Sequence, residues 1–228
     1  MKLSVSMTRR EALLGWIYLL ASYLAIPSLI ALLYNWLGLP LSEAMLNILY
    51  AITNFVFVLV IFWRFLLDSF KKLLSSPWRT LRFAALGFLM YYALSVLLSQ
   101  LILCIAPDFV NVNDAAIGEM TQDNYSAMAF CVIFLVPVAE EVFYRGLMFQ
   151  GLHQQNRRLA YLISILIFAA VHVFSYIGLY NWQTLLLCFV QYLPAGLAMA
   201  WAYEKADTIF APILIHITIN YLGMSAMR

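Results

Sequence analysis

The sequence predicts an all-α membrane protein, a polytopic bundle of about seven transmembrane helices with one further helix on the membrane surface. Of its 228 residues, 65% are hydrophobic and only 11% are charged, a balance typical of a chain that lies mostly in lipid. Apolar runs of about 20 residues, the length that crosses a bilayer as a helix, recur along the whole chain. No polar stretch between them is long enough for a second domain, so residues 1–228 are expected to form a single integral membrane domain.

Seven apolar runs are expected to cross the membrane as helices, joined by short polar connections. Pro27 lies within the first run and is expected to kink it. Either Asp207 or Thr208 is expected to cap the seventh helix, because both side chains can accept hydrogen bonds from the first turn of a helix. The seven runs cover residues 12–36, 44–63, 83–105, 125–148, 159–180, 184–203 and 209–224.

Basic and apolar residues alternate between the second and third runs, in residues 64–82. Their spacing predicts a helix with one apolar face that lies on the inner surface of the membrane. A helix that binds a partner protein, as calmodulin targets do, is the alternative interpretation. The basic residues of this segment are Arg64, Lys71, Lys72, Arg79 and Arg82.

The distribution of charge predicts the orientation of the chain. With alternating spans, every basic residue except Arg228 falls on one side, whereas the expected outer loop at residues 107–124 carries acids and no base. Because cytoplasmic loops are enriched in lysine and arginine, the N-terminus is expected inside and the C-terminus outside, in a bacterial cytoplasmic membrane. The net charge of +2 and the lack of a basic surface argue against nucleic acid as a partner, and favour the lipid bilayer.

The three cysteines give no sign of a disulfide framework or a zinc site. Cys104, Cys131 and Cys188 fall in separate apolar runs, without any Cys-x-x-Cys spacing. They are expected to be small buried hydrophobic residues.

The fourth apolar run contains charges where lipid would penalise them. Glu140, Glu141 and Arg145 lie in it, and each charged group costs roughly 2.5–3.5 kcal/mol at the bilayer centre, so such groups face the bundle interior and mark functional sites. Glu141 and Arg145 are at i and i+4 in the favourable order for an ion pair, which leaves Glu140 without a local partner. Pro137 cannot donate to the carbonyl of Ile133 and is expected to kink the helix before the acids. A charge cluster at the cytoplasmic helix end is the structural alternative.

Further polar side chains lie in the fifth and seventh runs. Phe168 and His172 share one helix face at i and i+4, and His216 and Asn220 do the same. Each polar group would need its own partner in lipid, so their convergence with Glu140 in one cavity is the economical arrangement. At 1.5 Å per residue, His172 would lie roughly 20 Å from the inner end of its span, and Glu140 and His216 roughly 10 Å from theirs, so convergence requires a tilted or displaced fifth helix.

Three complete motifs in this order resemble those of the CPBP intramembrane proteases, a family that includes the type II CAAX prenyl endopeptidases. The resemblance covers a motif-bearing catalytic half at about residues 127–223. It implies an enzyme, an endopeptidase that hydrolyses peptide bonds of a peptide or membrane-protein substrate inside the membrane. The motifs are Glu140-Glu141-Val-Phe-Tyr-Arg145, Phe168-Ala-Ala-Val-His172 and His216-Ile-Thr-Ile-Asn220.

The chemistry of these residues suits a water molecule activated by a glutamate. Glu140 is the expected general base, because a carboxylate in a low-dielectric cavity binds a proton more readily, and His172 is expected to hold the water with it. His216 and Asn220 can donate hydrogen bonds to the oxyanion, each good donor contributing about 3–4 kcal/mol.

Glu141 and Arg145, together with Phe168, are expected to support this site from behind rather than to react. The alternative chemistry is a zinc site, since His172, His216 and Glu140 would suit zinc with a bound water. The sequence lacks a His-Glu-x-x-His pattern, and an asparagine is an uncommon zinc ligand, so the metal-free mechanism without any cofactor is favoured.

Two non-catalytic functions are compatible with the same predicted helical fold. The protein could be a non-catalytic membrane partner of the same fold, serving immunity or protein display, or a small transporter with a proton relay through Glu140 and His172. Complete motifs favour catalysis over the first. The second is disfavoured because the two halves of the chain show no matching broken helices.

Overall fold

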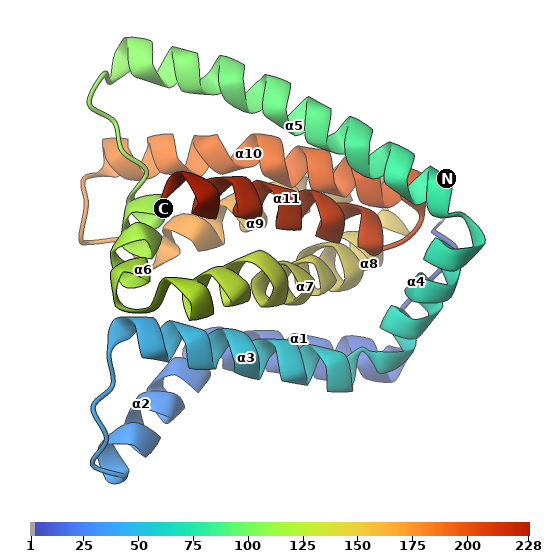
Figure 1. The fold of residues 1–228 in the computed structure, drawn as a ribbon. Helices are drawn as coiled ribbons and strands as arrows, with labels where there is room; N and C mark the ends of the chain where they lie inside the picture. The colour runs from blue at the N-terminus through green and yellow to red at the C-terminus, as the bar shows by residue number, and fades with distance from the viewer. Residues whose placement is uncertain (1–2) are drawn as a thin grey trace.

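The computed structural model describes residues 3–228, in which helices account for nearly all regular structure and no β-strand occurs (Figure 1). The predicted all-α membrane helix bundle is confirmed. The segments η1 and η2 are π-helical, and the other elements are α-helices. In chain order the elements are α1 (Arg9–Leu24), α2 (Ile26–Trp36), α3 (Glu43–Ile61), α4 (Trp63–Ser75), α5 (Pro77–Ile105), α6 (Val112–Phe130), η1 (Cys131–Leu135), α7 (Val136–Glu141), η2 (Val142–Phe149), α8 (Gln150–His153), α9 (Arg157–Phe174), α10 (Trp182–Ala206) and α11 (Phe210–Ala226).

Helices occupy all seven runs that were predicted to span the membrane. Five continuous helical stretches of the described chain are long and apolar enough to cross a bilayer, namely α3, α5, residues Asn124–His153, α9 and α10. The pair α1 and α2 passes the same test together, and α11 is a shorter apolar helix of 17 residues. The chain is thus an integral, multi-pass membrane protein.

The first span is broken, as Pro27 led us to expect. The axes of α1 and α2 differ by 55°, and Pro27 lies in the first turn of α2, where its missing N–H costs no intrahelical bond. None of the residues of α2 is buried. The helix accordingly projects away from the bundle (Figure 1).

The interfacial helix is shorter than predicted. It ends at Ser75 rather than near residue 82, because Pro77 starts α5, and Arg79 and Arg82 therefore belong to the first turns of that helix. Its buried face carries Phe65 and Ser69, whose backbone groups bind other parts of the chain. The N–H of Phe65 donates to Oε1 of Glu11 (2.9 Å), and the carbonyl of Ser69 accepts from Oγ1 of Thr208 (2.9 Å), which is buried.

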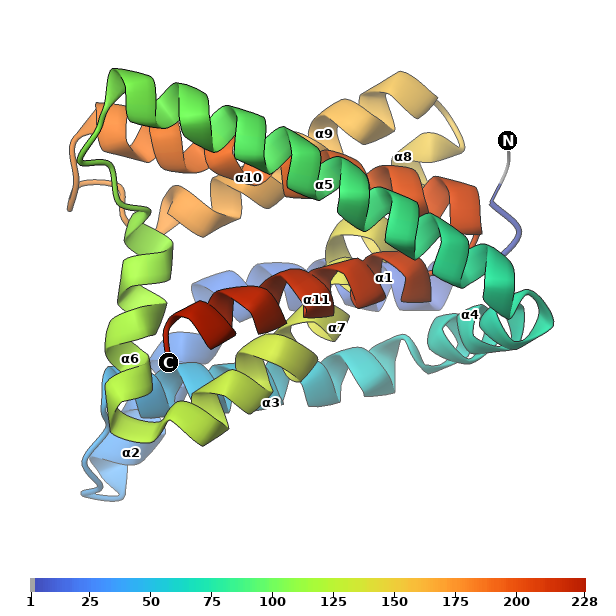
Figure 2. The same cartoon turned by 45° about the horizontal axis from the view of Figure 1, so that its top comes forward.

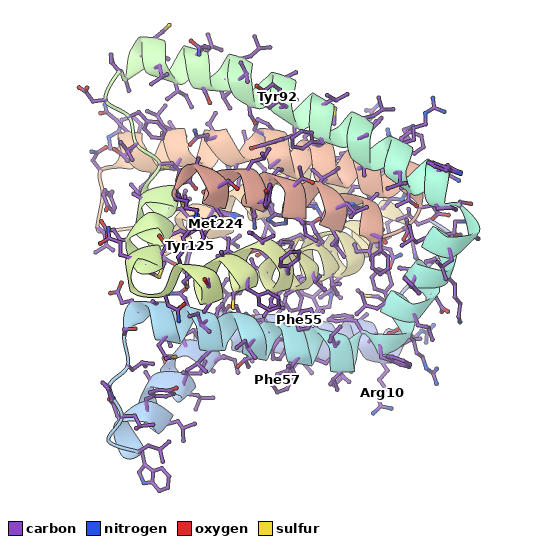
Figure 3. The ribbon with its side chains drawn as sticks, viewed as in Figure 1. Arg10, Phe55, Phe57, Tyr92, Tyr125 and Met224 are labelled. Carbon is purple, nitrogen blue, oxygen red and sulfur yellow. The ribbon has the colours of Figure 1, made fainter. Side chains whose placement is uncertain are left out.

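Residues 107–124 were predicted to form an outer loop, but most of them are helical, so the predicted conformation was wrong. Their position on the outer side stays a prediction. Helix α6 begins after Asn111, whose side chain accepts hydrogen bonds from the backbone N–H groups of Asn113 (3.0 Å) and Asp114 (3.3 Å). Non-helical torsion angles at Asn124 kink it. The helix lies across one end of the bundle (Figure 2), and the hydroxyl of Tyr125 ties it to α11 by donating to the carbonyl of Met224 (2.8 Å; Figure 3).

Two further boundaries differ from the prediction. Helix α9 ends at Phe174 instead of near residue 180, and a turn leads to α10, which Asn181 caps. Asp207 does not cap the seventh span. It ends α10 with a left-handed φ of 62°, and α11 begins at Phe210 after Ile209, which has no capping side chain. Thr208, the other candidate, lies one residue before the cap position, and its Oγ1 accepts a long hydrogen bond (3.5 Å) from the N–H of Phe210. The prediction that all three cysteines are buried was wrong for Cys104, which is exposed.

Basic residues gather at one end of the bundle. Helix α4, the beginning of α5 and the end of α10 lie at this end (Figure 1), and the C-terminus with Arg228 lies at the other. This arrangement agrees with the expected sorting of basic residues to one side of the membrane. The assignment of that side to the cytoplasm stays a prediction.

Candidate active site

Pro137 changes the register of the fourth span just before the two glutamates. The N–H of Val136 bonds to the carbonyl of Cys131, five residues back, and Pro137 has no N–H. The carbonyl of Val132 is therefore left without an intrahelical donor. Nδ2 of Asn220 donates to it at 2.7 Å, which fixes the motif asparagine of α11 against the fourth span.

Glu141 and Arg145 form the predicted ion pair, and both side chains are fully buried. Oε1 of Glu141 accepts a hydrogen bond from Nη1 of Arg145 (2.9 Å) and another from Nδ1 of His216 (2.9 Å). Nη2 of Arg145 donates to the carbonyl of Gly196 (3.2 Å), and its guanidinium lies 4.4 Å from the centre of the Phe168 ring. The ion pair is therefore desolvated, and its guanidinium packs on the face of the Phe168 ring. Its carboxylate also holds His216, one of the catalytic candidates.

Glu140 points away from this ion pair. Its Oε2 lies 4.0 Å from Nε2 of His172 and 3.9 Å from Nε2 of His216, and it has no hydrogen-bond partner within the described chain. The structure therefore brings together side chains from α7, α9 and α11. The depth mismatch expected from counting residues disappears because α9 crosses the bundle obliquely (Figure 2).

Both histidines present Nε2 to Glu140 because Nδ1 is held elsewhere. Nδ1 of His172 bonds to the carbonyl of Phe168 (2.7 Å), one turn earlier, and Nδ1 of His216 bonds to Glu141. A carbonyl and a carboxylate only accept hydrogen bonds, so each Nδ1 carries a proton. In the neutral form of either ring, the lone pair then lies on Nε2 and faces Glu140.

A network around Tyr192 was missed by the sequence analysis. The Tyr192 ring stacks on His172, with centroids 4.1 Å apart and planes 24° from parallel. Its hydroxyl accepts from Nδ2 of Asn113 (3.0 Å) and donates to Oδ1 of Asp114 (3.1 Å). The cluster of polar residues at the start of α6 was the signal available, but their partner lies some 80 positions further along the chain.

The Glu140 side chain faces a cavity of about 860 Å³. Carboxylates of Glu43 and Asp114 also line it, and no lysine or arginine of the described residues does. Asp114 is partly open to this cavity, yet the surrounding protein desolvates it and raises the pKa of its carboxyl, which the Tyr192 hydroxyl opposes by donating to it. The cavity is large enough to receive several residues of a peptide.

The residues that would hold zinc are spaced too widely. Zinc with bonds of 2.0–2.1 Å holds tetrahedral ligand atoms roughly 3.3 Å apart, whereas the two Nε2 atoms of His172 and His216 lie 4.0 and 3.9 Å from Oε2 of Glu140. Over residues 3–228, no group of three His, Cys, Asp or Glu side chains is placed to hold a metal ion.

A second polar cluster lies at the basic end of the bundle, around Glu204. The carboxylate is buried and accepts from His153 Nε2 (2.8 Å), from Arg157 Nε (2.6 Å) and Nη2 (2.8 Å), and from the Tyr161 hydroxyl (2.7 Å). It joins α8 and α9 to α10, on the far side of η2 from the Glu140 site. We assign it to stability rather than to chemistry.

Comparison with known proteins agrees with the motifs. Residues 122–222 match the family model described as type II CAAX prenyl endopeptidase Rce1-like. A curated relative, UPF0177 protein YxdF of Lactococcus lactis subsp. lactis (strain IL1403), is 30% identical over 94 residues, which are 41% of this chain. The chain spans about half of that relative, 46% of its length. No solved structure matches significantly. The matched segment carries all three motifs, and its similarity to this family model agrees with the resemblance to the CPBP intramembrane proteases that the motifs indicated.

Proposed function

We propose that this protein is an intramembrane endopeptidase in which Glu140 activates water to hydrolyse a peptide bond. The observation that carries this proposal is the unpaired carboxylate oxygen of Glu140, which faces two histidine nitrogens at the wall of a peptide-sized cavity. The similarity of residues 122–222 to a family of prenyl endopeptidases supports the same activity. A peptide or a segment of a membrane protein is the expected substrate.

The distances suit one water molecule shared by Glu140 and His172. For a water oxygen about 2.8 Å from both Oε2 of Glu140 and Nε2 of His172, the angle at the water between these two atoms would be roughly 90°. Water has two hydrogens, so it can donate to these two acceptors and to no third. If His216 were also neutral, its Nε2 would be an acceptor without a donor.

We therefore assign a second proton to His216. Its Nδ1 contacts the carboxylate of Glu141, which stabilises an imidazolium, whereas Nδ1 of His172 contacts a neutral carbonyl. The charges of the buried site then balance. Arg145 compensates Glu141, and His216 compensates Glu140, so that no net charge is left in the bundle interior.

Each residue then has one task in hydrolysis. Glu140 accepts a proton as the water oxygen attacks the carbonyl carbon, and the carbonyl oxygen becomes an oxyanion. Nε2–H of His216 and the second N–H of Asn220, whose first N–H is held by Val132, donate to that oxyanion. Glu140 passes its proton to the leaving amine as the C–N bond breaks. Product release restores the starting protonation states.

Zinc chemistry is the second candidate, and one observation favours it. Zinc-bound histidines usually donate their other ring N–H to a carboxylate or a carbonyl, as His172 and His216 do here. His172, His216 and Glu140 would be the ligands, after each approached by roughly half an ångström. The ion would supply Lewis-acid activation of water.

A cleavage assay with purified protein and a peptide library separates these possibilities. Metal-free catalysis predicts full activity after exhaustive chelation and none in Glu140→Gln, whose amide keeps the shape but cannot take the proton. Glu119→Gln is the matched control, since Glu119 is exposed on α6 away from the cavity. Zinc in stoichiometric amount, lost in His172→Ala and in His216→Ala together with activity, would make the metal mechanism correct. Absence of cleavage throughout would favour the non-catalytic partner protein.

A further inference from the structure

Two contacts hold the ring of His172, in addition to the tilted Phe168 ring of the same helix, whose centroid lies 4.6 Å away. One is the hydrogen bond from Nδ1 to the carbonyl of Phe168, which holds one edge of the ring. A single hydrogen bond leaves the ring free to tilt about that edge. The other contact is the face of Tyr192, stacked at a centroid separation of 4.1 Å, which fixes the plane of the ring.

Tyr192 is itself held by α6. Its hydroxyl accepts one hydrogen bond from Asn113 and donates one to Asp114, so both functions of the hydroxyl are satisfied and the ring cannot slide without breaking them. The neighbouring residue Gln191 is tied to the same helix end, because Nδ2 of Asn111 donates to its Oε1 (2.7 Å). The start of α6 is thus hydrogen-bonded to α10 at the position where Tyr192 of α10 stacks on His172.

The remainder of α6 packs mainly against α3 and η1 rather than against α10. The helix is kinked at Asn124, and Glu119 on it is exposed. It lies across the end of the bundle nearest the C-terminus (Figure 2). Asp114 and Asn113 also line the cavity that Glu140 faces. The hydrogen bonds from Asn113 and Asp114 to Tyr192 therefore connect the cavity wall to the ring of His172.

We propose that Tyr192 is a positioning residue for His172, and that its hydroxyl links the orientation of this histidine to the seating of α6. Tyr192 touches no reacting atom in this proposal. It acts by holding Nε2 of His172 toward Glu140. The kinetic consequence rests on the proposed peptidase function, whereas the ring orientation can be measured without turnover.

Nitrogen-15 NMR of the histidine rings, in detergent micelles or nanodiscs, reads this directly. The chain has only three histidines, so single His→Gln variants assign every ring signal. In the wild type we expect Nδ1 of His172 to carry a proton whether the ring is neutral or charged, so the neutral ring should be the Nδ1–H tautomer. Tyr192→Leu removes the stack and should give a mixture of tautomers or a broadened signal for His172. The signals of His153 and His216 should stay unchanged.

Kinetics supply the second measurement. Misplacing a catalytic group by about 1 Å can cost roughly 100-fold in rate, so kcat of Tyr192→Leu should fall by roughly 10- to 100-fold with KM nearly constant. Tyr192→Phe keeps the stack but loses the hydroxyl bonds to α6, so its kcat should be lower than that of the wild type and higher than that of Tyr192→Leu. Tyr221→Leu is the matched control, because Tyr221 is exposed on α11 and should leave both kinetic constants unchanged.

The two measurements together decide the proposal. Unchanged His172 signals in folded Tyr192→Leu would overturn it. If Tyr192→Leu does not fold, unchanged His172 signals and unchanged kcat in both Tyr192→Phe and Asp114→Asn would overturn the link to α6. Reoriented His172 with normal turnover would leave the positioning contact standing and remove His172 from the proposed mechanism. If the wild-type protein shows no peptidase activity, the NMR spectra still test whether Tyr192 orients the ring of His172.

Discussion

Glu141→Gln tests how the buried ion pair divides its effect between stability and chemistry. Oε1 of Glu141 receives hydrogen bonds from Arg145 and from His216, each at 2.9 Å, and neither Glu141 nor Arg145 has exposed surface. Glutamine nearly preserves the shape and one acceptor but removes the negative charge. Arg145 then remains as a buried cation without its counter-ion, and its partners are neutral: the amide oxygen, the carbonyl of Gly196 and an aromatic face.

The expected magnitude follows from that isolation. Removing one partner of a buried ion pair costs about 3–5 kcal/mol, whereas replacing both partners with well-packed neutral groups is often close to neutral. The single variant Glu141→Gln should therefore lose about 3–5 kcal/mol of unfolding free energy, and Glu141→Gln/Arg145→Met should recover most of it. Reversible denaturation in mixed micelles, followed by circular dichroism for the wild type, both single variants and the double variant, measures the coupling.

Turnover should not recover with stability. In the double variant Nδ1 of His216 still lacks its carboxylate partner, so the imidazolium that we propose as oxyanion donor is less well supported and kcat stays low, as expected from weakening a good donor. Two results would refute this reasoning. A double variant as unstable as Glu141→Gln would show that the orphaned cation is not the source of the cost, and a double variant with wild-type turnover would show that the contact between Glu141 and His216 has no part in the chemistry.

Three other predictions test separate parts of the molecule. Asn220→Ala leaves the Val132 carbonyl without a donor, so it should lose about 1–3 kcal/mol of stability in micelle denaturation and roughly 10²- to 10³-fold in kcat. Glu204→Gln weakens charged hydrogen bonds at the far end of the bundle and should lower the unfolding free energy by about 1.5–3 kcal/mol, while the KM of folded enzyme stays constant. Reporter fusions after Lys72 should lie inside and fusions within residues 108–123 outside, and a cytoplasmic signal from the latter range would contradict the orientation.

The geometry of the two adjacent glutamates was predictable from helix periodicity. Successive residues of an α-helix point about 100° apart, so Glu140 and Glu141 had to face different neighbours, and only Glu141 had an arginine one turn later. The structure places Glu141 on Arg145 and leaves Glu140 facing the histidines. Which ring Glu141 would also reach was not predictable, because His216 is 75 residues away and spacing carries no information across that gap.

Helix α6 was not predictable from hydropathy, since its first half is polar and reads as a loop. It is stable because Asn111 caps it and because its side chains bind α10. Contacts such as that between Asn113 and Tyr192 form only when the fold is complete. The end of α4 was missed although Pro77 marks it in the sequence. The end of α9 was missed because apolar residues continue as far as Tyr180, and local backbone geometry rather than hydrophobicity stops the helix.

Pro137 and Asn220 show how two features read separately in the sequence become one arrangement in the structure. The proline was expected only to kink the helix, and the asparagine was assigned to the oxyanion. The proline deprives the carbonyl of Val132 of a donor, and the asparagine supplies one at 2.7 Å. Its amide has two hydrogens, so one can hold α11 against the fourth span while the other stays available to substrate. The same contact that repairs the backbone thus fixes the direction in which the remaining N–H points, which is the preorganisation that oxyanion stabilisation requires.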